Sequence, residues 1–179
     1  DRLLASFTAA LPAPRRGYAI VRCALDMGLR CSEIARLMLT DIDWRAGTLT
    51  LKHTKSHRQD VLPLPEATGE ALAEYLRHER PTSTIATVFV RRYAPHNQPV
   101  GVGAVRGAIG KALRCAGISQ GRSHSLRHTL ACRLINSGDS IKEVADVLRH
   151  RSLNTSLIYA KLDHRRLAEV ALPWPGSAT

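Results

Sequence analysis

Residues 124–159, HSLRHTLACRLINSGDSIKEVADVLRHRSLNTSLIY, form the stretch around which the rest of the chain can be interpreted. It opens with H-x-x-R-H, in which His124 and Arg127 stand three residues apart and therefore share one face of a helix. Further along, His150 precedes Tyr159 by nine residues. Cationic and proton-transferring side chains followed by a tyrosine are what an enzyme needs to attack a phosphodiester with a side-chain oxygen.

A second helix is predicted between these two parts of the stretch. Ser140 and Glu143 match the S-x-x-E capping box, which marks a helix N-terminus. Apolar residues then recur at i, i+3, i+4 and i+7, which predicts one buried stripe along the helix. The stripe consists of Ile141, Val144, Ala145 and Leu148, and the helix is expected to end in the basic cluster Arg149, His150 and Arg151.

The composition points to a polyanionic partner. Lys and Arg outnumber Asp and Glu by 26 to 15, a formal charge of +11, and such an excess most often indicates nucleic acid. Charge alone would also fit a basic protein of another kind. No apolar run is long enough to span a membrane, so no membrane partner is expected. The four cysteines form no C-x-x-C pair, which favours free thiols in a reducing cytosol.

The apolar periodicity predicts a mainly α protein with a small three-stranded antiparallel β-sheet, an α+β fold. Between residues 41 and 65 the period changes to that of strands, with turns at 45–47 and 55–57. Gly28 is expected to end the helix before it and Ser32 to cap the next one. Helices are expected at residues 17–27, 65–80 and 102–116, with short helices at 1–11 and 163–170 and an irregular segment at 82–98.

H-S-L-R-H followed by L-R-H-R-S-L-N-T-S-L-I-Y resembles the C-terminal signature of the tyrosine recombinases, also called the phage integrase family. The usual pattern there is H-x-L-R-H, then L-G-H-x-x, then a tyrosine nine residues after that histidine. G-L-R-x-x-E-I from Gly28 and T-K-S-H-R-Q-D-V-L-P-L from Thr54 match two further blocks in the family's order. In one departure, Arg149 stands where the family commonly has glycine, which accepts a positive φ at a helix C-terminus.

The resemblance implies which residues hold and attack the scissile phosphate. Arg30 and Arg127 would grip its oxygens with planar, permanently charged guanidinium groups. Glu33 would support Arg30. Tyr159 would be the nucleophile and form a 3′-phosphotyrosyl link, whereas a lone tyrosine outside such a pattern is usually a packing residue.

The same resemblance implies the proton-transferring groups. Lys55 would be the general acid for the leaving 5′ oxygen, with Lys52 on the neighbouring strand as a competing candidate. His124 would assist proton transfer, and His150 would hydrogen-bond the phosphate in the transition state. His128 is expected to support the site from its helix.

No metal site and no cofactor are expected. The histidines of H-x-x-x-H lack the intervening glutamate of metalloproteases, and the acidic residues are too scattered for a two-metal nuclease. Double-stranded DNA is the expected partner, and further phosphate contacts are expected from Arg106, Lys111, Arg122, Arg149 and Arg151.

The resemblance runs from about Gly28 to Tyr159 and implies a single catalytic domain over residues 1–179. Residues 1–14 would end a linker from an N-terminal DNA-binding domain. Residues 160–179 would form a tail, in which 164–174 would dock either on its own domain or, as the resemblance implies, on a neighbouring protomer in a dimer or tetramer on DNA. The implied function is site-specific DNA recombination or integration without metal or ATP, in the cytoplasm at the nucleoid. A type IB topoisomerase-like nicking and resealing enzyme, or an inactive DNA-binding accessory module, are the alternatives.

Overall fold

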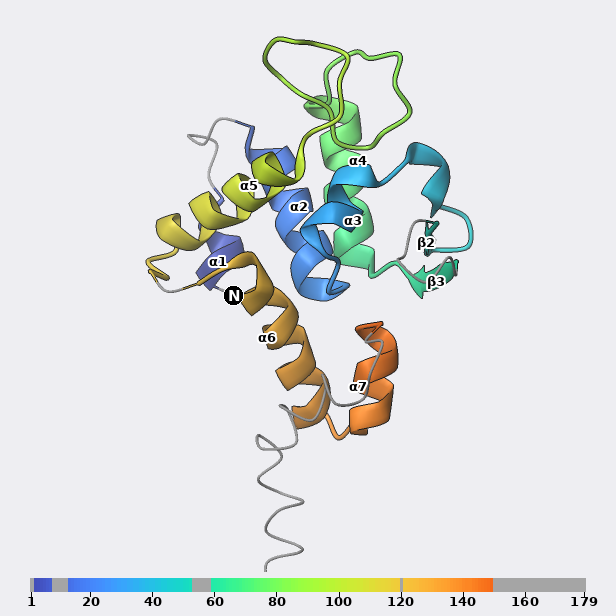
Figure 1. The fold of residues 1–179 in the computed structure, drawn as a ribbon, viewed down its shortest axis with the longest axis vertical. Helices are drawn as coiled ribbons and strands as arrows, with labels where there is room; N and C mark the ends of the chain where they lie inside the picture. Colours follow the sequence, from blue (N-terminus) through green and yellow to red (C-terminus); the bar gives the residue numbers. More distant parts are fainter. Residues whose placement is uncertain (1, 8–12, 53–58, 120, 150–179) are drawn as a thin grey trace, which may run out of the picture. The chain divides into compact units, whose positions relative to one another are not determined.

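The computed structural model describes residues 2–7, 13–52, 59–119 and 121–149 (Figure 1). The chain divides into two compact units, residues 1–130 and 131–179, which are described separately. Among the described residues, helices are the main regular structure of both units, with one small sheet in the first, so the predicted fold class is confirmed. The first unit contains α1 (Arg2–Ala5), α2 (Pro14–Asp26), α3 (Cys31–Arg36), the 3₁₀ turn η1 (Leu39–Asp41), β1 (Ile42–Asp43), β2 (Thr48–Leu51), β3 (Asp60–Pro63), α4 (Glu66–His78), α5 (Val102–Cys115) and the start of α6 (Ser123–Asn136).

Helix α2 is the centre of the first unit, and Figure 1 shows it between α4 and α5, with α3 alongside. Its apolar positions recur on one face and are all buried, as the sequence predicts. Cys23 lies on that face, and burial raises the pKa of its thiol to about 12, so the thiol stays protonated. The core around α2 includes Ile20, Val21, Ala24, Leu25, Leu72, Tyr75, Val105 and Ile109.

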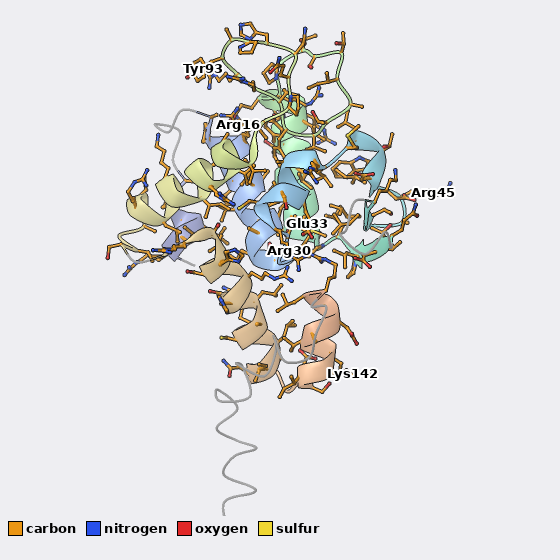
Figure 2. All side chains as sticks on the ribbon, viewed as in Figure 1. Arg16, Arg30, Glu33, Arg45, Tyr93 and Lys142 are labelled. Carbon is orange, nitrogen blue, oxygen red and sulfur yellow. The ribbon has the colours of Figure 1, made fainter. Side chains whose placement is uncertain are left out.

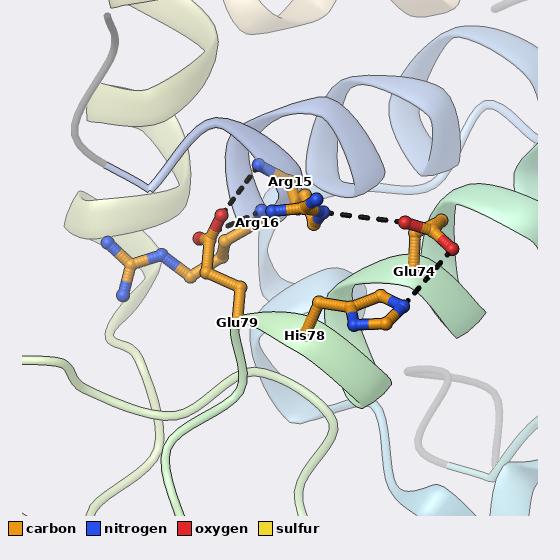
Figure 3. A network of polar contacts seen from close by, with 5 residues as sticks. All are labelled: Arg15, Arg16, Glu74, His78 and Glu79. Atoms are coloured by element: carbon orange, nitrogen blue, oxygen red, sulfur yellow. Dashed lines mark hydrogen bonds and ion pairs between the residues drawn. The ribbon is translucent and has the colours of Figure 1, made fainter. Parts of the chain in front are cut away.

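A carboxylate from the end of α4 holds the N-terminus of α2 (Figure 3). The side chain of Glu79 accepts hydrogen bonds from the backbone N–H groups of Arg15, at 2.8 Å, and Arg16, at 3.2 Å. These donors have no partner inside the helix, and the helix dipole favours a negative charge at this end. The guanidinium of Arg15 also reaches Glu74, at 3.4 Å. Helix α2 is therefore anchored at one end, and its other end leads into the candidate site.

The sheet has strand order β1-β2-β3, with both pairs antiparallel. Gly47 makes the first turn with φ 63, a left-handed value that favours glycine. Along β2, Leu49 and Leu51 face the core and are buried. The alternation of Ile42 and Trp44 predicts a strand that includes both residues. Strand β1 instead ends at Asp43, and Trp44 lies beyond it with 50% of its surface exposed. The second turn lies outside the described residues.

The start of α3 differs from the sequence prediction. Ser32 was expected to cap this helix, and that prediction is wrong, because the helix begins at Cys31 with Arg30 as the N-cap. The carboxylate of Glu33 reaches back and accepts the backbone N–H of Arg30 at 2.7 Å. A side chain inside the first turn thus performs the capping that was assigned to the serine.

The described part of the second unit holds the rest of α6 and α7 (Ile141–Val147). The predicted capping box is present: Ser140 N–H donates to Glu143 Oε2 at 2.6 Å, and Glu143 N–H donates to Ser140 Oγ at 3.2 Å. Of the predicted apolar stripe, Val144, Ala145 and Leu148 are buried, and Ile141 is half-buried.

All four cysteines lie among the described residues and are free thiols, as predicted. Within the described parts of the chain, no helix combines the length and the apolar character needed to cross a membrane.

Candidate active site

A single glycine turn begins the candidate site. After α2 ends at Asp26, Gly28 takes φ 59, which glycine adopts without steric cost. Its carbonyl oxygen accepts a hydrogen bond from Nη1 of Arg127, which comes from α6 almost a hundred residues later. Two residues after the turn, Arg30 begins α3. The Gly28 turn therefore contributes to the placement of both arginines that the sequence singles out.

Arg30 is held by the carboxylate of Glu33 (Figure 2). One oxygen accepts the Arg30 backbone N–H, and the other accepts the guanidinium Nη1 at 2.8 Å. The side chain of Glu33 is only 8% exposed, whereas that of Arg30 is 40% exposed. A buried carboxylate thus orients a guanidinium whose outer edge stays accessible to a ligand, which suits recognition of an anion.

Helix α6 supplies the H-x-x-R-H motif. Its start is fixed at Arg122, whose N–H donates to Ser125 Oγ at 3.0 Å. Arg127 is buried at 7% exposure, and His124, one turn earlier, is exposed. The apolar residue between them, Leu126, is buried in the core of the first unit, so it holds this face of the helix in place.

Arg30, His124 and Arg127 line one cleft of about 140 Å³. Arg106 of α5 lines it as well, although the sequence pattern marked this residue only as a DNA contact. No carboxylate is among the described residues that line the cleft, where three guanidinium groups and an imidazole meet, and Glu33 pairs with Arg30 from outside that lining. Such a wall attracts an anion. The remaining lining residues, which the sequence did not single out, are Leu29, Cys31, Ser32, Val102 and Ser123.

Other predicted residues lie elsewhere. His128 is exposed on α6 and does not line the cleft. Lys111 is exposed on α5 and lines a separate pocket that includes Arg16 and Arg92. Arg122 is exposed at the start of α6. Lys55, His150, Arg151 and Tyr159 lie outside the described residues.

Lys52, the rival to Lys55 as general acid, has a partner of its own. Its Nζ forms an ion pair with Oδ1 of Asp41 at 2.9 Å. It lines a small cleft that shares Ser32 with the cleft of Arg30 and Arg127 but includes neither arginine. A proton donor for the leaving oxygen must lie within hydrogen-bond reach of it. Lys55 lies outside the described residues, so its choice over Lys52 stays a prediction. Across residues 2–7, 13–52, 59–119 and 121–149, no three His, Cys, Asp or Glu side chains form a group that could hold a metal ion.

Arg149, which stands where the family commonly has glycine, takes the glycine-like conformation. Its φ is 52, and its N–H donates to the carbonyl of Asp146 at 2.9 Å just after α7. A left-handed conformation costs a non-glycine residue roughly 1–2 kcal/mol. The turn is therefore retained although the residue is unfavourable for it.

We expect Arg149→Gly to raise the melting temperature by about 2 °C. Relief of the left-handed strain is worth roughly 1–2 kcal/mol, and the extra freedom of glycine in the unfolded chain removes about 0.4–1 kcal/mol of that gain. Gly138→Ala is the matched control, because Gly138 has φ 99 and an added Cβ would meet nothing within 4 Å. It should melt at a lower temperature. A lower value for Arg149→Gly as well would show that the contacts of the arginine outweigh the strain.

The phage integrase family model matches residues 2–166, so the chain belongs to this family. A candidate integrase/recombinase of Sinorhizobium fredii, y4rA, is 39% identical over 180 residues, which are 99% of this chain and 44% of y4rA. Tyrosine recombinase XerC of Corynebacterium glutamicum is 28% identical over 155 residues, 86% of this chain and 49% of XerC. The chain thus spans less than half the length of these relatives.

The fold agrees with this membership. The solved structure of the XerH site-specific recombinase, bound to a palindromic difH substrate in a post-cleavage complex, superposes with a TM-score of 0.78. The match covers 94% of this chain and 49% of that one at 22% identity, so the two share the fold.

Proposed function

We propose that the chain is the catalytic domain of a DNA strand transferase that performs site-specific recombination through a tyrosine nucleophile. The observation that carries the proposal is the cleft in which Arg30, His124 and Arg127 meet, with no carboxylate among the described residues that line it. Membership of the phage integrase family and the spacing of Tyr159 from the preceding histidine support it. Glu33 keeps one guanidinium oriented, and the Gly28 carbonyl keeps the other.

In the proposed reaction, the phenolic oxygen of Tyr159 attacks the scissile phosphorus, and the bond from phosphorus to the 5′ oxygen breaks. The guanidinium groups of Arg30 and Arg127 stabilise the charge on the nonbridging oxygens, with a hydrogen bond from His150. Lys55 gives its proton to the departing 5′ oxygen, and His124 accepts the proton that the tyrosine loses. The phosphotyrosyl link conserves the energy of the phosphodiester, so a 5′ hydroxyl of a second strand can reverse the step without ATP.

The wider assignments follow from the proposed reaction. Its partner is double-stranded DNA, and further phosphate contacts come from Arg106, Lys111, Arg122, Arg149 and Arg151. Because DNA is the partner, we also propose a location at the nucleoid in the cytoplasm. Recombination joins two duplexes, so we propose a dimer or tetramer on DNA with residues 164–174 as the link between protomers. Residues 1–14 would connect to an N-terminal DNA-binding domain.

We expect the chain to form a covalent adduct with DNA in excess EDTA and without ATP. Arginine and lysine side chains bring the positive charge that a metal ion would otherwise supply. The substrate is a library of end-labelled nicked duplexes with randomised sequence at the nick. Cleavage close to the nick releases a short fragment, which diffuses away, so the strand cannot be resealed and the covalent adduct accumulates. Labelled DNA that migrates with the protein in denaturing gels is the readout. An absolute need for a divalent ion, or no adduct at all, contradicts the proposal.

A type IB topoisomerase-like activity would also give this adduct, so strand exchange separates the two. We expect the trapped adduct to join a 5′ hydroxyl supplied by a second duplex. Resealing of the original strand alone, together with relaxation of supercoiled plasmid by nicking, would favour the topoisomerase.

A further inference from the structure

The buried side chain of Asp41 forms an anchor next to the candidate site. Its carboxylate is 7% exposed and lies at the end of η1. One oxygen accepts the backbone N–H of Met38 at 2.9 Å, and the other contacts the ammonium group of Lys52 at 2.9 Å. Burying a carboxylate costs free energy unless it is paired, so the contact with Lys52 is needed to keep Asp41 buried.

Lys52 stands at the base of a hairpin. The last pair of the β2–β3 ladder joins Leu51 to Asp60, and Lys52 is the next residue along the chain. The segment that closes the hairpin therefore begins at a residue whose side chain is tied to η1. That segment contains Lys55, three residues further on.

The anchor is also close to the carboxylate that orients Arg30. Glu33, Asp41 and Lys52 line one small cleft beside α3. On its other side, Glu33 holds the guanidinium of Arg30. The base of the hairpin is thus held next to α3, the helix whose N-cap is Arg30, one of the proposed phosphate-binding arginines.

We propose that Asp41 is a positioning residue, which through its ion pair with Lys52 fixes the base of the hairpin so that Lys55 can protonate the leaving 5′ oxygen. The proposal rests on the proposed function for the role of Lys55, and on the ion pair and the strand register for the anchoring. Asp41 acts only through Lys52 and does not itself contact a reacting atom.

The test uses Asp41→Asn, which keeps an oxygen for the Met38 N–H but removes the charge that holds Lys52. We expect the rate of adduct formation on the best duplex of the nicked library to fall by roughly tenfold to hundredfold, the size of effect that a misplaced catalytic group produces. DNA affinity should stay within about twofold of the parent chain, because phosphate contacts elsewhere carry most of the binding.

A substrate with sulfur in place of the 5′ bridging oxygen separates positioning from general damage. A thiol has a pKa of about 8.5, so it leaves as a thiolate and needs no general acid. We expect the parent chain and Asp41→Asn to cleave this substrate at rates within about threefold of each other. A loss that persists on the sulfur substrate would overturn the proposal, since it would show that the whole site is disturbed.

Two matched variants complete the experiment. Asp43→Asn changes the other aspartate of the same D-I-D segment, whose carboxylate is exposed and accepts the N–H groups of Arg45 and Ala46, and should leave the rate on normal DNA unchanged. Lys52→Met should reproduce Asp41→Asn, and the double variant should lose no more than either one alone, because both remove the same contact. Additive losses would show that the two residues act separately.

Amide hydrogen exchange tests the anchoring without any DNA. In Asp41→Asn, the amides at Leu51 and Asp60 should exchange about fivefold faster, as expected when an ion pair of this exposure is lost. The amide of Leu64, which donates to the Gly47 carbonyl at 2.8 Å at the other end of the β2–β3 ladder, should not change. Unchanged exchange at the hairpin base overturns the anchor, whereas faster exchange in a chain that forms no adduct would overturn only the proposed function.

Discussion

Replacing Arg127 by lysine should slow adduct formation by roughly a thousandfold, the upper range for loss of a transition-state donor. The guanidinium of Arg127 is buried, donates to the Gly28 carbonyl and lines the cleft, so its planar fork can serve the backbone and the phosphate together. A lysine ammonium is a single point of charge and cannot reproduce this geometry. Single-turnover adduct formation on the nicked library measures the loss.

The control is Arg133→Lys, an exposed arginine in the last turn of the same helix. It should leave the rate within about twofold of the parent, because it makes the same chemical change away from the cleft. DNA affinity should be nearly equal in the two variants, since one phosphate contact among many is altered. Strong adduct formation by Arg127→Lys would mean that positive charge alone suffices and that the fork has no special role.

Much of this site could be predicted from local patterns. The spacing of His124 and Arg127 places them on one helical face, and the structure brings both to the same cleft. The glycine after α2 predicts a left-handed turn, and Gly28 has φ 59. Strand-like alternation predicts the three-stranded antiparallel sheet, which is confirmed. The helical face, the glycine turn and the strands each follow from residues a few positions apart in the chain, so a single sequence is enough to predict them.

Contacts between distant segments could not be predicted in this way. The bond from Arg127 to the Gly28 carbonyl joins residues that no periodicity relates, and only the family resemblance brought Arg30 together with Arg127. The Lys52 and Asp41 ion pair joins β2 to η1 and has no sequence signal of its own. Arg106 could be seen as a basic residue, but its place in the cleft depends on how α5 packs against α2 and α3.

The error at α3 has a local physical reason. Ser32 is a favourable N-cap residue, but Glu33 can cap the helix from within its first turn and bind the Arg30 guanidinium with the same carboxylate. One group then fulfils two functions. Capping preferences treat each residue separately, so they favoured the serine.

Replacing Tyr159 by phenylalanine should abolish the covalent adduct, with a loss on the order of 10⁴ or more, because the reaction loses its nucleophile. The change removes one oxygen atom and leaves the ring, so packing and the positive charge of the cleft are retained. We therefore expect DNA affinity within about twofold of the parent chain, since phosphate contacts are unchanged.

Tyr93→Phe is the matched control for this variant, because Tyr93 is 68% exposed and outside the cleft, and it should form adduct at the parent rate. Proteolysis of the parent adduct followed by mass spectrometry should find the nucleotide on the peptide that contains Tyr159. If Tyr159→Phe still forms adduct, another side chain attacks the phosphorus. The nine-residue spacing from His150 would then have no catalytic meaning in this chain, although the arginine cleft would still bind the phosphate.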